Sequence, residues 1–467
     1  MKLSENIILD TDSYKVSMWK QYPTGTEYVY SYIESRGGKY SQTEFIGVQA
    51  FARRLAKIRI TQYDIDIADK IWTAHGEPFN RAGWEYILDV HGGKLPVRVK
   101  AAKEGLIIPT KNVLCTIENT DPKVPWLTTW IETPALRAIW YPTTVGTMSW
   151  HIKQVILNYL EKSGDPTTIG FKLHGFGARG VSSLESAGIG DGAHLVNFMG
   201  TDTMSAVLHV MDTYGGDVCG FSIPASEHST ITSWGRENEI EAYRNMIVQF
   251  GKPGATIACV SDSYNIYTAC KMWGELRDEI IASGATLVIR PDSGDPLEVV
   301  PKMMYILEEQ FGVVMNDKGY KVLNNVRVLW GDGINALSLE SILRNLVDLH
   351  GYSADNIAFG MGGGLLQQLD RDTLKFAMKC SSIGIRNYKN DDDLHGTLVW
   401  RDVFKDPATD PGKASKKGRV TLFKTEDGKE YFTGVEDWRK DELETYFENG
   451  EQVFTQTFDQ VRANSML

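Results

Sequence analysis

The chain has 467 residues, of which 42% are hydrophobic and 23% charged, and its formal net charge is -11. A chain of this length exceeds the size at which one hydrophobic core usually stops growing, so two or more packed units are expected. The acidic balance, without a long basic run, argues against nucleic acid or an anionic membrane as a partner.

Cysteine usage and the N-terminal residues indicate the compartment. The five cysteines are odd in number and form no C-x-x-C pair, which argues against a disulfide framework or a structural zinc site. The start, MKLSENIILDTDSYK, lacks the basic-then-apolar pattern of a signal peptide. No window approaches the roughly 18 apolar residues that span a bilayer. We expect a soluble cytoplasmic protein.

Both ends of the chain contain segments typical of strands, and the N-terminal end also contains segments typical of helices. The segments VYSYIESR, LPVRVKAA, GLIIPT and VLCTIEN are typical of strands, and Val48–Ile58 and Trp126–Ile139 of helices. Near the C-terminus RVTLFK and KEYFTG again resemble strands. We predict a mixed α/β domain in which residues 1–165 pack with residues 386–467.

Residues 166–385 repeat one pattern, in which a short apolar run ends in a polar burst and a helical stretch follows. The predicted strands are Phe171–Leu173, Leu195–Phe198, Gly220–Ile223, Thr256–Val260, Thr286–Ile289, Val326–Leu329 and Ile357–Phe359. One predicted helix places Leu339, Ile342, Leu343, Leu346 and Leu349 on a single face before a capping Gly351. The repeat predicts an irregular (β/α) barrel whose chemistry collects at the carboxyl ends of the strands. An open doubly wound sheet is the alternative.

A glycine cluster, Gly360-Met361-Gly362-Gly363-Gly364, follows the last of these runs. Glycine lets a backbone approach a ligand closely, and a helix N-terminus offers unpaired N–H groups to an anion. Barrel enzymes often hold phosphate at a late loop of this kind. Glycine runs also serve tight turns, so Gly362 and Gly363 form either a phosphate cradle or a turn.

Two other runs end in Arg290-Pro291-Asp292-Ser293-Gly294 and Gly331-Asp332-Gly333. Carboxylates at neighbouring strand ends can accept ribose hydroxyls or hold Mg²⁺ through water. A rim salt bridge and a simple turn are the alternatives, but recurrence at successive strand ends favours a site.

Four further residues are candidates from their local sequence. In HGFGARG the ring of Phe176 and the guanidinium of Arg179 could stack a flat heterocycle and hold a phosphate, although a core Phe and a surface Arg are common. Asp202 in GTDT is a candidate polar site residue, and the alternative is a helix N-cap. His228 in SEHST could be a buried, hydrogen-bonded histidine. From the residues alone, the prediction is a barrel enzyme that acts on a phosphorylated substrate.

The chain closely resembles the nicotinamide phosphoribosyltransferase family, of the type II phosphoribosyltransferases. The resemblance runs from DSYKVSMWKQYP at residues 12–23 to SKKGR at residues 415–419. Between them lie NTDPKVPWLTTWIET, AHLVNFMGTDT, SEHSTITSWG, VSDSYNIY, VIRPDSGDPL, GDGIN and NIAFGMGGGLLQQLDRD. This resemblance implies an irregular α/β barrel with a second α/β domain, in a homodimer. It also implies the reaction, in which nicotinamide and phosphoribosyl pyrophosphate give nicotinamide mononucleotide for NAD salvage.

The resemblance also implies residue roles. The nicotinamide ring would lie between Phe176 and Tyr14 of the partner subunit, and Asp202 would accept a hydrogen bond from the carboxamide. The implied nucleotide-binding residues are Arg179, Arg290, Asp292, Gly331, Asp332, Gly362 and Gly363. The implied contributions across the dimer interface are Asp12, Arg371 and Lys379, with Lys416 or Lys417 near the pyrophosphate.

The implied catalytic residues are His228, Arg290 and Asp292. His228 resembles the histidine that ATP, an activating co-substrate, phosphorylates in this family. Mg²⁺ is expected mainly through pyrophosphate and water, near Asp292, without a dedicated set of protein ligands.

The sequence departs from the family at four positions. An acidic residue before the Phe is Gly175 here, an aromatic two residues after it is Ala178, a phosphate-binding serine is Ala377, and an Asp in VSDSYD is Asn265. These departures bear on the tunnel and on some phosphate contacts.

Rival functions are weighed by single residues. Nicotinate phosphoribosyltransferase has related architecture, but Asp202 would repel the carboxylate of nicotinate. A catalytically idle homologue that binds nucleotides or acts as a signalling partner would be expected to lack Arg290, Asp292 or the glycine cluster, and all of these are present. A barrel aldolase or isomerase acting on sugar phosphates would require a Lys or Glu at a strand end, and the sequence has none well placed.

Overall fold

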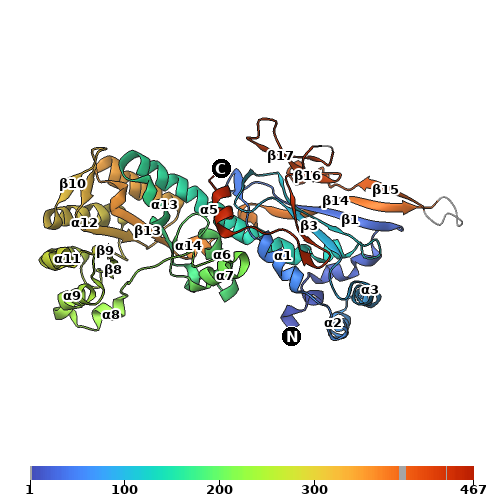
Figure 1. The fold of residues 1–467 in the computed structure, drawn as a ribbon, viewed down its shortest axis with the longest axis horizontal. Coiled ribbons are helices and arrows are strands. Elements are labelled where there is room, and N and C mark those ends of the chain that lie inside the picture. The colour runs from blue at the N-terminus through green and yellow to red at the C-terminus, as the bar shows by residue number, and fades with distance from the viewer. Residues whose placement is uncertain (1–2, 389–395, 438, 467) are drawn as a thin grey trace. The chain divides into compact units, whose positions relative to one another are not determined.

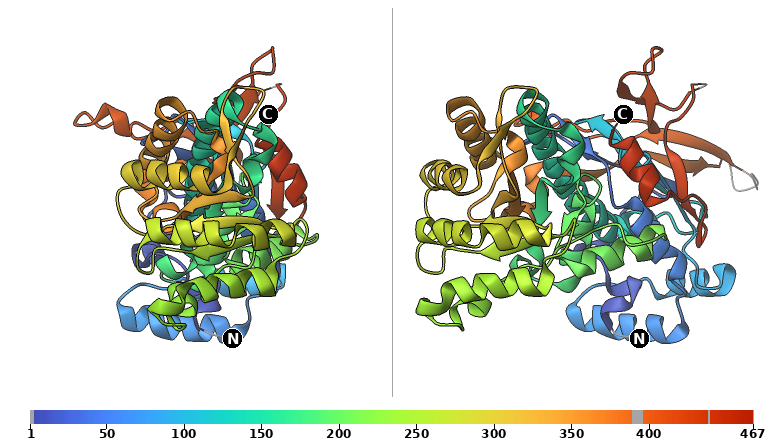
Figure 2. Two further views of the ribbon diagram at one scale, coloured as in Figure 1. Left: turned by 90° about the vertical axis from the view of Figure 1, so that its left-hand side faces the viewer. Right: turned by 60° about the vertical axis from the view of Figure 1, so that its left-hand side comes forward.

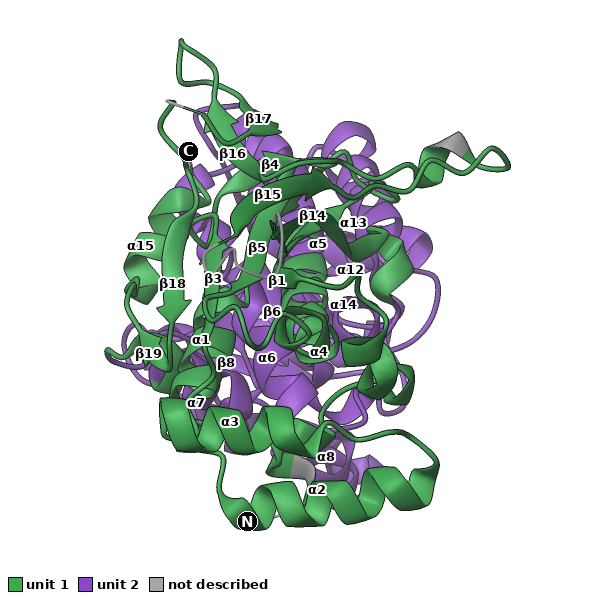
Figure 3. Ribbon diagram, turned by 90° about the vertical axis from the view of Figure 1, so that its right-hand side faces the viewer, with its two compact units in different colours: residues 1–147, 212–216, 370–467 green, residues 148–211, 217–369 purple. Residues whose placement is uncertain are grey.

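The computed structural model describes residues 3–388, 396–437 and 439–466 (Figure 1). The chain divides into two compact units (Figure 3). Unit 1 contains residues 1–147, 212–216 and 370–467, and unit 2 contains residues 148–211 and 217–369. Within the described residues no helix is long and apolar enough to cross a membrane.

Unit 2 is built on a curled parallel sheet with the strand order β7-β6-β13-β12-β9-β8. Its strands are β6 Leu173–Gly175, β7 Gly200–Thr201, β8 Thr256–Val260, β9 Thr286–Arg290, β12 Val326–Trp330 and β13 Ile357–Met361. Beyond the sheet, Phe221 makes an isolated parallel bridge to Gly200 and Ala225 makes one to Ala258. The segment 221–225 therefore pairs with both edge strands, and the sheet curls into a half-barrel with this irregular segment between its edges.

Helices follow the strands of unit 2, and several pack on the outer side of the sheet (Figures 1 and 2). They are α6 Leu184–His194, α7 Met204–Tyr214, α8 His228–Thr232, α9 Glu239–Phe250, α10 Ile266–Glu275, α11 Arg277–Ser283, α12 Pro296–Phe311, α13 Ala336–Arg344 and α14 Gly363–Leu366. A hairpin of β10 Val313–Met315 and β11 Lys321–Leu323 follows α12. The strand-then-helix order places every strand-to-helix loop at one edge of the sheet.

The structure confirms four of the seven predicted strands, Thr256–Val260, Thr286–Ile289, Val326–Leu329 and Ile357–Phe359, whereas of Phe171–Leu173 only Leu173 lies in a strand, β6. Thr256–Val260 forms β8 with the predicted bounds, whereas Leu195–Phe198 forms a turn after α6 and the strand lies at Gly200–Thr201. Gly220–Ile223 contributes only the bridge at Phe221. Leu349 was predicted on the buried face of its helix but is 74% exposed, because the helix widens into a π-helical turn over Asn345–Leu349.

Unit 1 contains an antiparallel sheet with the strand order β15-β14-β1-β5-β3-β18-β19. Its strands are β1 Thr26–Ser35, β3 Val97–Ala101, β5 Val113–Asn119, β14 Phe376–Asn387, β15 Thr397–Asp402, β18 Glu444–Glu448 and β19 Glu451–Gln452. The separate pairs are β2 Gln42–Glu44 with β4 Ile107–Pro109, and β16 Val420–Lys424 with β17 Tyr431–Val435. Strands from both ends of the chain thus pair in one sheet, since β1 lies between β14 and β5.

The core of unit 1 is rich in tryptophan. Trp84, Trp126 and Trp130 contact one another edge to face, with ring centroids 4.9–5.7 Å apart. The helices of this unit are α1 Val48–Lys57, α2 Gln62–His75, α3 Arg81–His91, α4 Leu127–Trp130 and α15 Phe458–Asn464, and α5 Glu132–Ser163 continues into unit 2. The predicted helix Trp126–Ile139 is therefore two helices, separated at Ile131.

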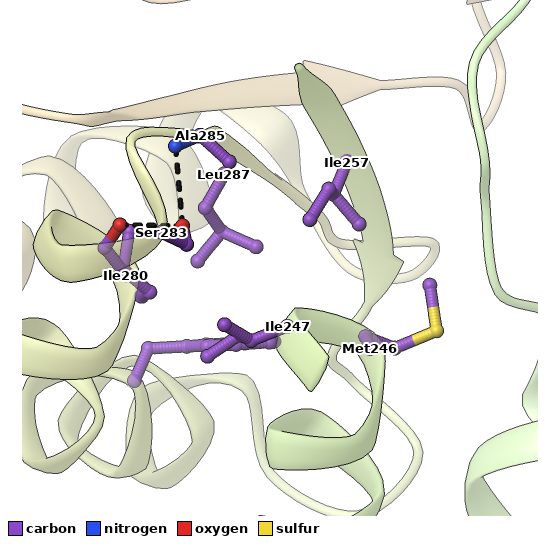
Figure 4. A pocket seen from close by; sticks show the side chains of 8 residues that line it. Met246, Ile247, Ile257, Ile280, Ser283, Ala285 and Leu287 are labelled. Carbon is purple, nitrogen blue, oxygen red and sulfur yellow. Dashed lines mark hydrogen bonds between the residues drawn. The ribbon is translucent and has the colours of Figure 1, made fainter. Parts of the chain in front are cut away.

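An apolar cavity of about 10 Å³ lies between α9, α10, α11 and the strands β8 and β9 (Figure 4). Met246, Ile257 and Leu287 line it, and Ser283 turns its hydroxyl to backbone groups at its edge. A space of this size holds at most one water molecule, so it is a packing gap and not a ligand site.

Candidate active site

The carboxyl ends of the unit 2 strands bring the predicted site residues of this unit to one edge of the sheet. The residues in question are Phe176, Arg179, Asp202, His228, Arg290, Asp292, Gly331, Asp332, Gly362 and Gly363. Because the strands are parallel, these loops face the same side regardless of their separation in sequence.

The ring of Phe176 lies against the ends of β12 and β13. A Cβ built on Gly360 would be 1.9 Å from this ring, and one built on Gly331 would be 3.7 Å from it. The backbone N–H of Phe176 donates to the carbonyl of Met361 at 2.9 Å, which fixes the loop to β13. Gly360 is therefore a glycine because an aromatic ring occupies the space of its side chain.

Asp202 is held by two donors beside this ring. Its Oδ1 is 2.8 Å from Nε2 of His174 and accepts from the hydroxyl of Ser222 at 2.5 Å. Burial raises the pKa of Asp202, but hydrogen bonds from His174 and Ser222 and the charge of Arg290 outweigh it, so the pKa is lowered from 3.8. His174 and Phe176 are also in ring contact, with centroids 4.9 Å apart. Asp202 is an ionised acceptor next to an aromatic platform.

His228 lies in a cluster of polar groups at the ends of β8 and β9. Its Nδ1 is 3.0 Å from the hydroxyl of Ser263, and its Nε2 lies 3.6 Å from Asp262 and 3.7 Å from Asp292. The His228 side chain is 45% exposed, whereas that of Asp262 is only 6% exposed. Asp262 orders the cluster, because its Oδ2 accepts from the N–H of Asp292 and from the hydroxyl of Ser293.

Two groups at this edge retain hydrogen-bonding capacity. Nε of Arg290 is buried, and among the described residues it has no hydrogen-bond partner. Gly363 begins α14, where the first N–H groups lack intrahelical acceptors, and a Cβ built on it would meet nothing within 4 Å. A Cβ built on Gly180, in the loop that carries Arg179, would approach Gly363 to 3.4 Å, so this loop lies beside the glycine cluster.

The remaining predicted residues lie in unit 1. Tyr14 is 58% exposed, and Asp12, also exposed, accepts from the hydroxyl of Thr133 at 2.8 Å. Burial lowers the pKa of Lys379, and the positive charges of Arg36, Lys405 and Arg371 act in the same direction.

Lys416 belongs to the same group of cations. It pairs with the buried Glu34, whose carboxyl also feels Arg36 and Lys379. The ammonium of Lys417 lies 5.4 Å from the ring centroid of Phe404. Lys416, Arg36 and Lys379 thus act on Glu34, and Arg371 acts in turn on Lys379.

The structure tests whether protein groups alone could cage a metal ion. Among the described residues no group of three or more His, Cys, Asp or Glu side chains is placed to hold one. The buried Oδ1 of Asp262 lacks a hydrogen-bond partner in the described chain, and Asp292 beside it is 43% exposed. Asp262 and Asp292 are therefore two carboxylates available at this edge.

Three residues of this edge were not predicted from the sequence, namely His174, Ser222 and Asp262, and the contact of Gly360 with Phe176 was not predicted either. His174 lies two residues before Phe176 and Asp262 lies two residues after the end of β8, so position was the available signal for these two, whereas Ser222 follows only the isolated bridge at Phe221. Their roles depend on contacts between loops that are distant in sequence.

The comparisons with known proteins agree with this geometry. A family model described as the nicotinate phosphoribosyltransferase (NAPRTase) family matches residues 171–451, and a model of the nicotinamide phosphoribosyltransferase N-terminal domain matches residues 6–99. A nicotinamide phosphoribosyltransferase of Xanthomonas campestris pv. campestris (strain 8004) is 52% identical, covering 100% of this chain and 99% of that protein. One of Acinetobacter baylyi (strain ATCC 33305 / BD413 / ADP1) is 30% identical, covering 97% and 95%.

Solved structures show the same fold at low sequence identity. A nicotinate-nucleotide pyrophosphorylase from Pyrococcus furiosus matches with a TM-score of 0.62 at 15% identity, covering 99% of this chain and 95% of that one. The human nicotinic acid phosphoribosyltransferase matches with a TM-score of 0.58 at 15% identity, covering 98% and 93%.

The curled parallel sheet, its strand-end site and the matched models define the class, a phosphoribosyltransferase of the NAPRTase type and so a pentosyltransferase. Within it, the chain belongs to the nicotinamide phosphoribosyltransferase family, as the resemblance predicted.

Proposed function

We propose that this enzyme transfers the phosphoribosyl group of phosphoribosyl pyrophosphate to nicotinamide, giving nicotinamide mononucleotide and pyrophosphate for NAD salvage. The observation that carries the proposal is the ionised Asp202 beside Phe176, in a chain that matches a nicotinamide phosphoribosyltransferase over its whole length. A carboxylate accepts the N–H of an amide but repels a carboxylate, so the site favours nicotinamide over nicotinate.

The reaction needs a leaving anion and a positioned base, and no protein nucleophile. The bond from the anomeric carbon to the pyrophosphate oxygen breaks, and its electron pair leaves with pyrophosphate. The ring nitrogen of nicotinamide then supplies the pair that forms the new bond to that carbon, through an oxocarbenium-like state. Arg290 would stabilise the departing charge, and Phe176 and Asp202 would orient the base.

The neighbouring loops would hold the ribose and its phosphate. Asp292, Gly331 and Asp332 would hold the ribose, while Gly362 and Gly363 would cradle the 5′-phosphate with their N–H groups next to Arg179. Mg²⁺ bound to pyrophosphate would neutralise charge on the leaving group. Asp292, which is 43% exposed, would meet that hydrated cation.

We also propose that ATP activates the enzyme by phosphorylating His228. The imidazole would attack the γ-phosphorus, and ADP would leave with the electron pair of the broken P–O bond. The half-exposed ring, held through Nδ1 by Ser263, supports this role. His228→Ala should abolish ATP hydrolysis and its enhancement of synthesis while leaving a residual ATP-independent rate. Undiminished acid-labile phosphate on the variant would refute the role.

A homodimer with shared sites is the proposed assembly. Tyr14 of the partner subunit would face Phe176, and Asp12, Arg371, Lys379, Lys416 and Lys417 would come from unit 1 of the partner. Support comes from the exposure of Tyr14 and Asp12 and from the cations gathered near Lys379, which suit an anion.

Complementation tests this sharing. The variants Asp12→Ala and Arg179→Ala should each be inactive, and in a mixed dimer one site would carry both lesions and the other would carry none. With random mixing about half the dimers are mixed, so activity should return to roughly a quarter of wild type. No recovery, with subunit exchange confirmed by mass, would refute the shared site.

Two coarser proposals accompany these. As functional domains, we take residues 166–385 as the catalytic barrel and residues 1–165 with 386–467 as the second α/β domain. We also propose a cytoplasmic location, supported by five free cysteines, four of them buried, which suit a reducing compartment.

The test of the proposed function is to incubate the enzyme with phosphoribosyl pyrophosphate and Mg²⁺, offer nicotinamide or nicotinate, and identify the nucleotide. Nicotinamide mononucleotide is the expected product. Efficient formation of nicotinate mononucleotide instead would favour the alternative, a nicotinate phosphoribosyltransferase.

A further inference from the structure

The last turn of α6 places a fully buried carboxylate, that of Asp191, directly behind the strand that leads to Phe176. A Cβ built on Gly175 would lie 2.2 Å from Oδ1 and 2.6 Å from Oδ2 of Asp191. The backbone of Gly175 does not adopt the left-handed conformation that favours glycine. Position 175 is therefore a glycine because the Asp191 carboxylate occupies the space of its side chain.

The Thr201 hydroxyl links Asp191 to the base subsite, the place beside Phe176 and Asp202 that we assign to nicotinamide. The Thr201 hydroxyl donates to Oδ2 of Asp191 at 2.6 Å and accepts from the N–H of Thr203 at 2.8 Å. Asp202 lies between these two threonines, and its own N–H donates to the carbonyl of Gly175 at 3.0 Å. The backbone on both sides of Asp202 is thus fixed by a chain of bonds that ends on Asp191.

The environment of Asp191 is costly for a group with only a packing role. Its Oδ1 is buried and has no hydrogen-bond partner among the described residues. A buried carboxylate with spare capacity destabilises a fold relative to an apolar side chain of similar size. A small apolar residue would fill the space behind Gly175 without that cost, but it could not accept the Thr201 hydroxyl.

We propose that Asp191 is a positioning residue for the base subsite, which through Thr201 sets the place of Asp202 and hence the choice of amide over acid. This inference rests on the proposed function, because it assigns Asp202 to the carboxamide. Helix α6 thus supplies the carboxylate of Asp191 in the volume that an acidic side chain at position 175 would otherwise fill.

Kinetics separate this role from a structural one. Asp191→Ala and Thr201→Val should each raise the KM for nicotinamide by roughly tenfold, the effect of about one lost hydrogen bond, with kcat nearly unchanged and discrimination against nicotinate reduced. Asp191→Asn keeps an acceptor for Thr201 and should stay within about threefold of wild type, by the same reasoning.

Ser149→Ala is the matched control. The buried Ser149 hydroxyl lies 2.9 Å from Nδ1 of His194, on the same turn of α6 as Asp191, but it makes no hydrogen bond to Thr201. This variant should lose stability without any change in KM or base preference. If Asp191→Ala changes the melting temperature alone, as the control does, the positioning role is overturned.

A cycle of unfolding measurements tests the geometry, and one kinetic measurement accompanies it. Gly175→Ala should strongly lower the melting temperature in the wild-type chain and have little effect in the Asp191→Ala background, where the colliding carboxylate is gone. In that background Gly175→Asp should restore the KM for nicotinamide. Equal cost of Gly175→Ala in both backgrounds would overturn the inference, whereas a wild-type enzyme inactive on both bases would instead overturn the proposed function.

Discussion

Two buried carboxylates, one in each unit, have opposite surroundings. Glu104 in unit 1 is saturated, because Oε1 accepts from the N–H groups of Gly47 and Gln49 and Oε2 accepts from the hydroxyl of Tyr214. Asp262 in unit 2 uses only Oδ2, and its buried Oδ1 faces the imidazole of His228 at 3.6 Å.

The contrast separates polar groups whose hydrogen bonds stabilise the fold from those with hydrogen-bonding capacity left for a ligand. Burial raises the pKa of Glu104, although its backbone donors and Tyr214 oppose the rise, so these bonds are what make a buried carboxyl tolerable. At the strand ends of unit 2, Asp262 and Arg290 keep unused capacity that a ligand can satisfy. Substitutions in the first region should affect stability, and those in the second should affect turnover.

The largest expected effect is on stability. Glu104→Ala leaves two N–H groups and one hydroxyl unpaired in the core, at about 1–3 kcal/mol each, so the free energy of unfolding should fall by at least about 3 kcal/mol. Glu451→Ala, which removes a carboxylate that is 61% exposed, should cost less than about 1 kcal/mol. Denaturant titration measures both, and similar values would show that the bonds to Glu104 do not hold the fold of unit 1.

Arg290→Ala should act on turnover. Removing a donor aimed at developing negative charge typically lowers kcat by about 10²–10³-fold. The melting temperature should remain close to that of wild type, because the Arg290 Nε has no partner to lose in the described part of the chain. A variant that loses stability while keeping its kcat would place Arg290 with the structural groups.

Asp202→Ser sharpens the comparison within the site. It should weaken the use of nicotinamide by about 1–3 kcal/mol, the cost of unpairing one charged hydrogen bond, and relieve the rejection of nicotinate. Steady-state kinetics on each base give the ratio of the two kcat/KM values. An unmoved ratio would show that another residue selects the base.

The smallest effect is a pH dependence of stability. Burial lowers the pKa of His194 below 6.5, although Asp191 opposes the shift. The unfolded chain therefore binds a proton that the folded chain refuses, and the free energy of unfolding should decline as the pH falls below 6.5, by at most about 1.4 kcal/mol per pH unit for one proton. His194→Gln should flatten this decline. An identical slope in both proteins would contradict the assignment.

The sequence predicted those parts of the fold that local pattern determines. Long β-branched runs such as Thr256–Val260 became buried parallel strands. The run Leu195–Phe198 is equally apolar but forms a buried turn, because burial alone does not distinguish a strand from a turn. The two-residue strand β7 depends on pairing with β6, which no local pattern encodes.

For the site, the sequence placed residues at strand ends but not their partners. Asp202 was predicted, yet the donors that keep it ionised, His174 and Ser222, come from loops on other strands. Asp191 could not be predicted either, because its significance lies in the space that it takes from Gly175. Contacts between loops distant in sequence decide these roles.

A direct competition tests the central claim, that the strand-end site of unit 2 transfers a phosphoribosyl group to an amide. The enzyme is given limiting phosphoribosyl pyrophosphate, Mg²⁺ and equal concentrations of nicotinamide and nicotinate, and the two mononucleotides are quantified. The account predicts nicotinamide mononucleotide in large excess, and an excess that shrinks in Asp202→Ser. Equal amounts from the wild-type enzyme, or an excess of nicotinate mononucleotide, would contradict it.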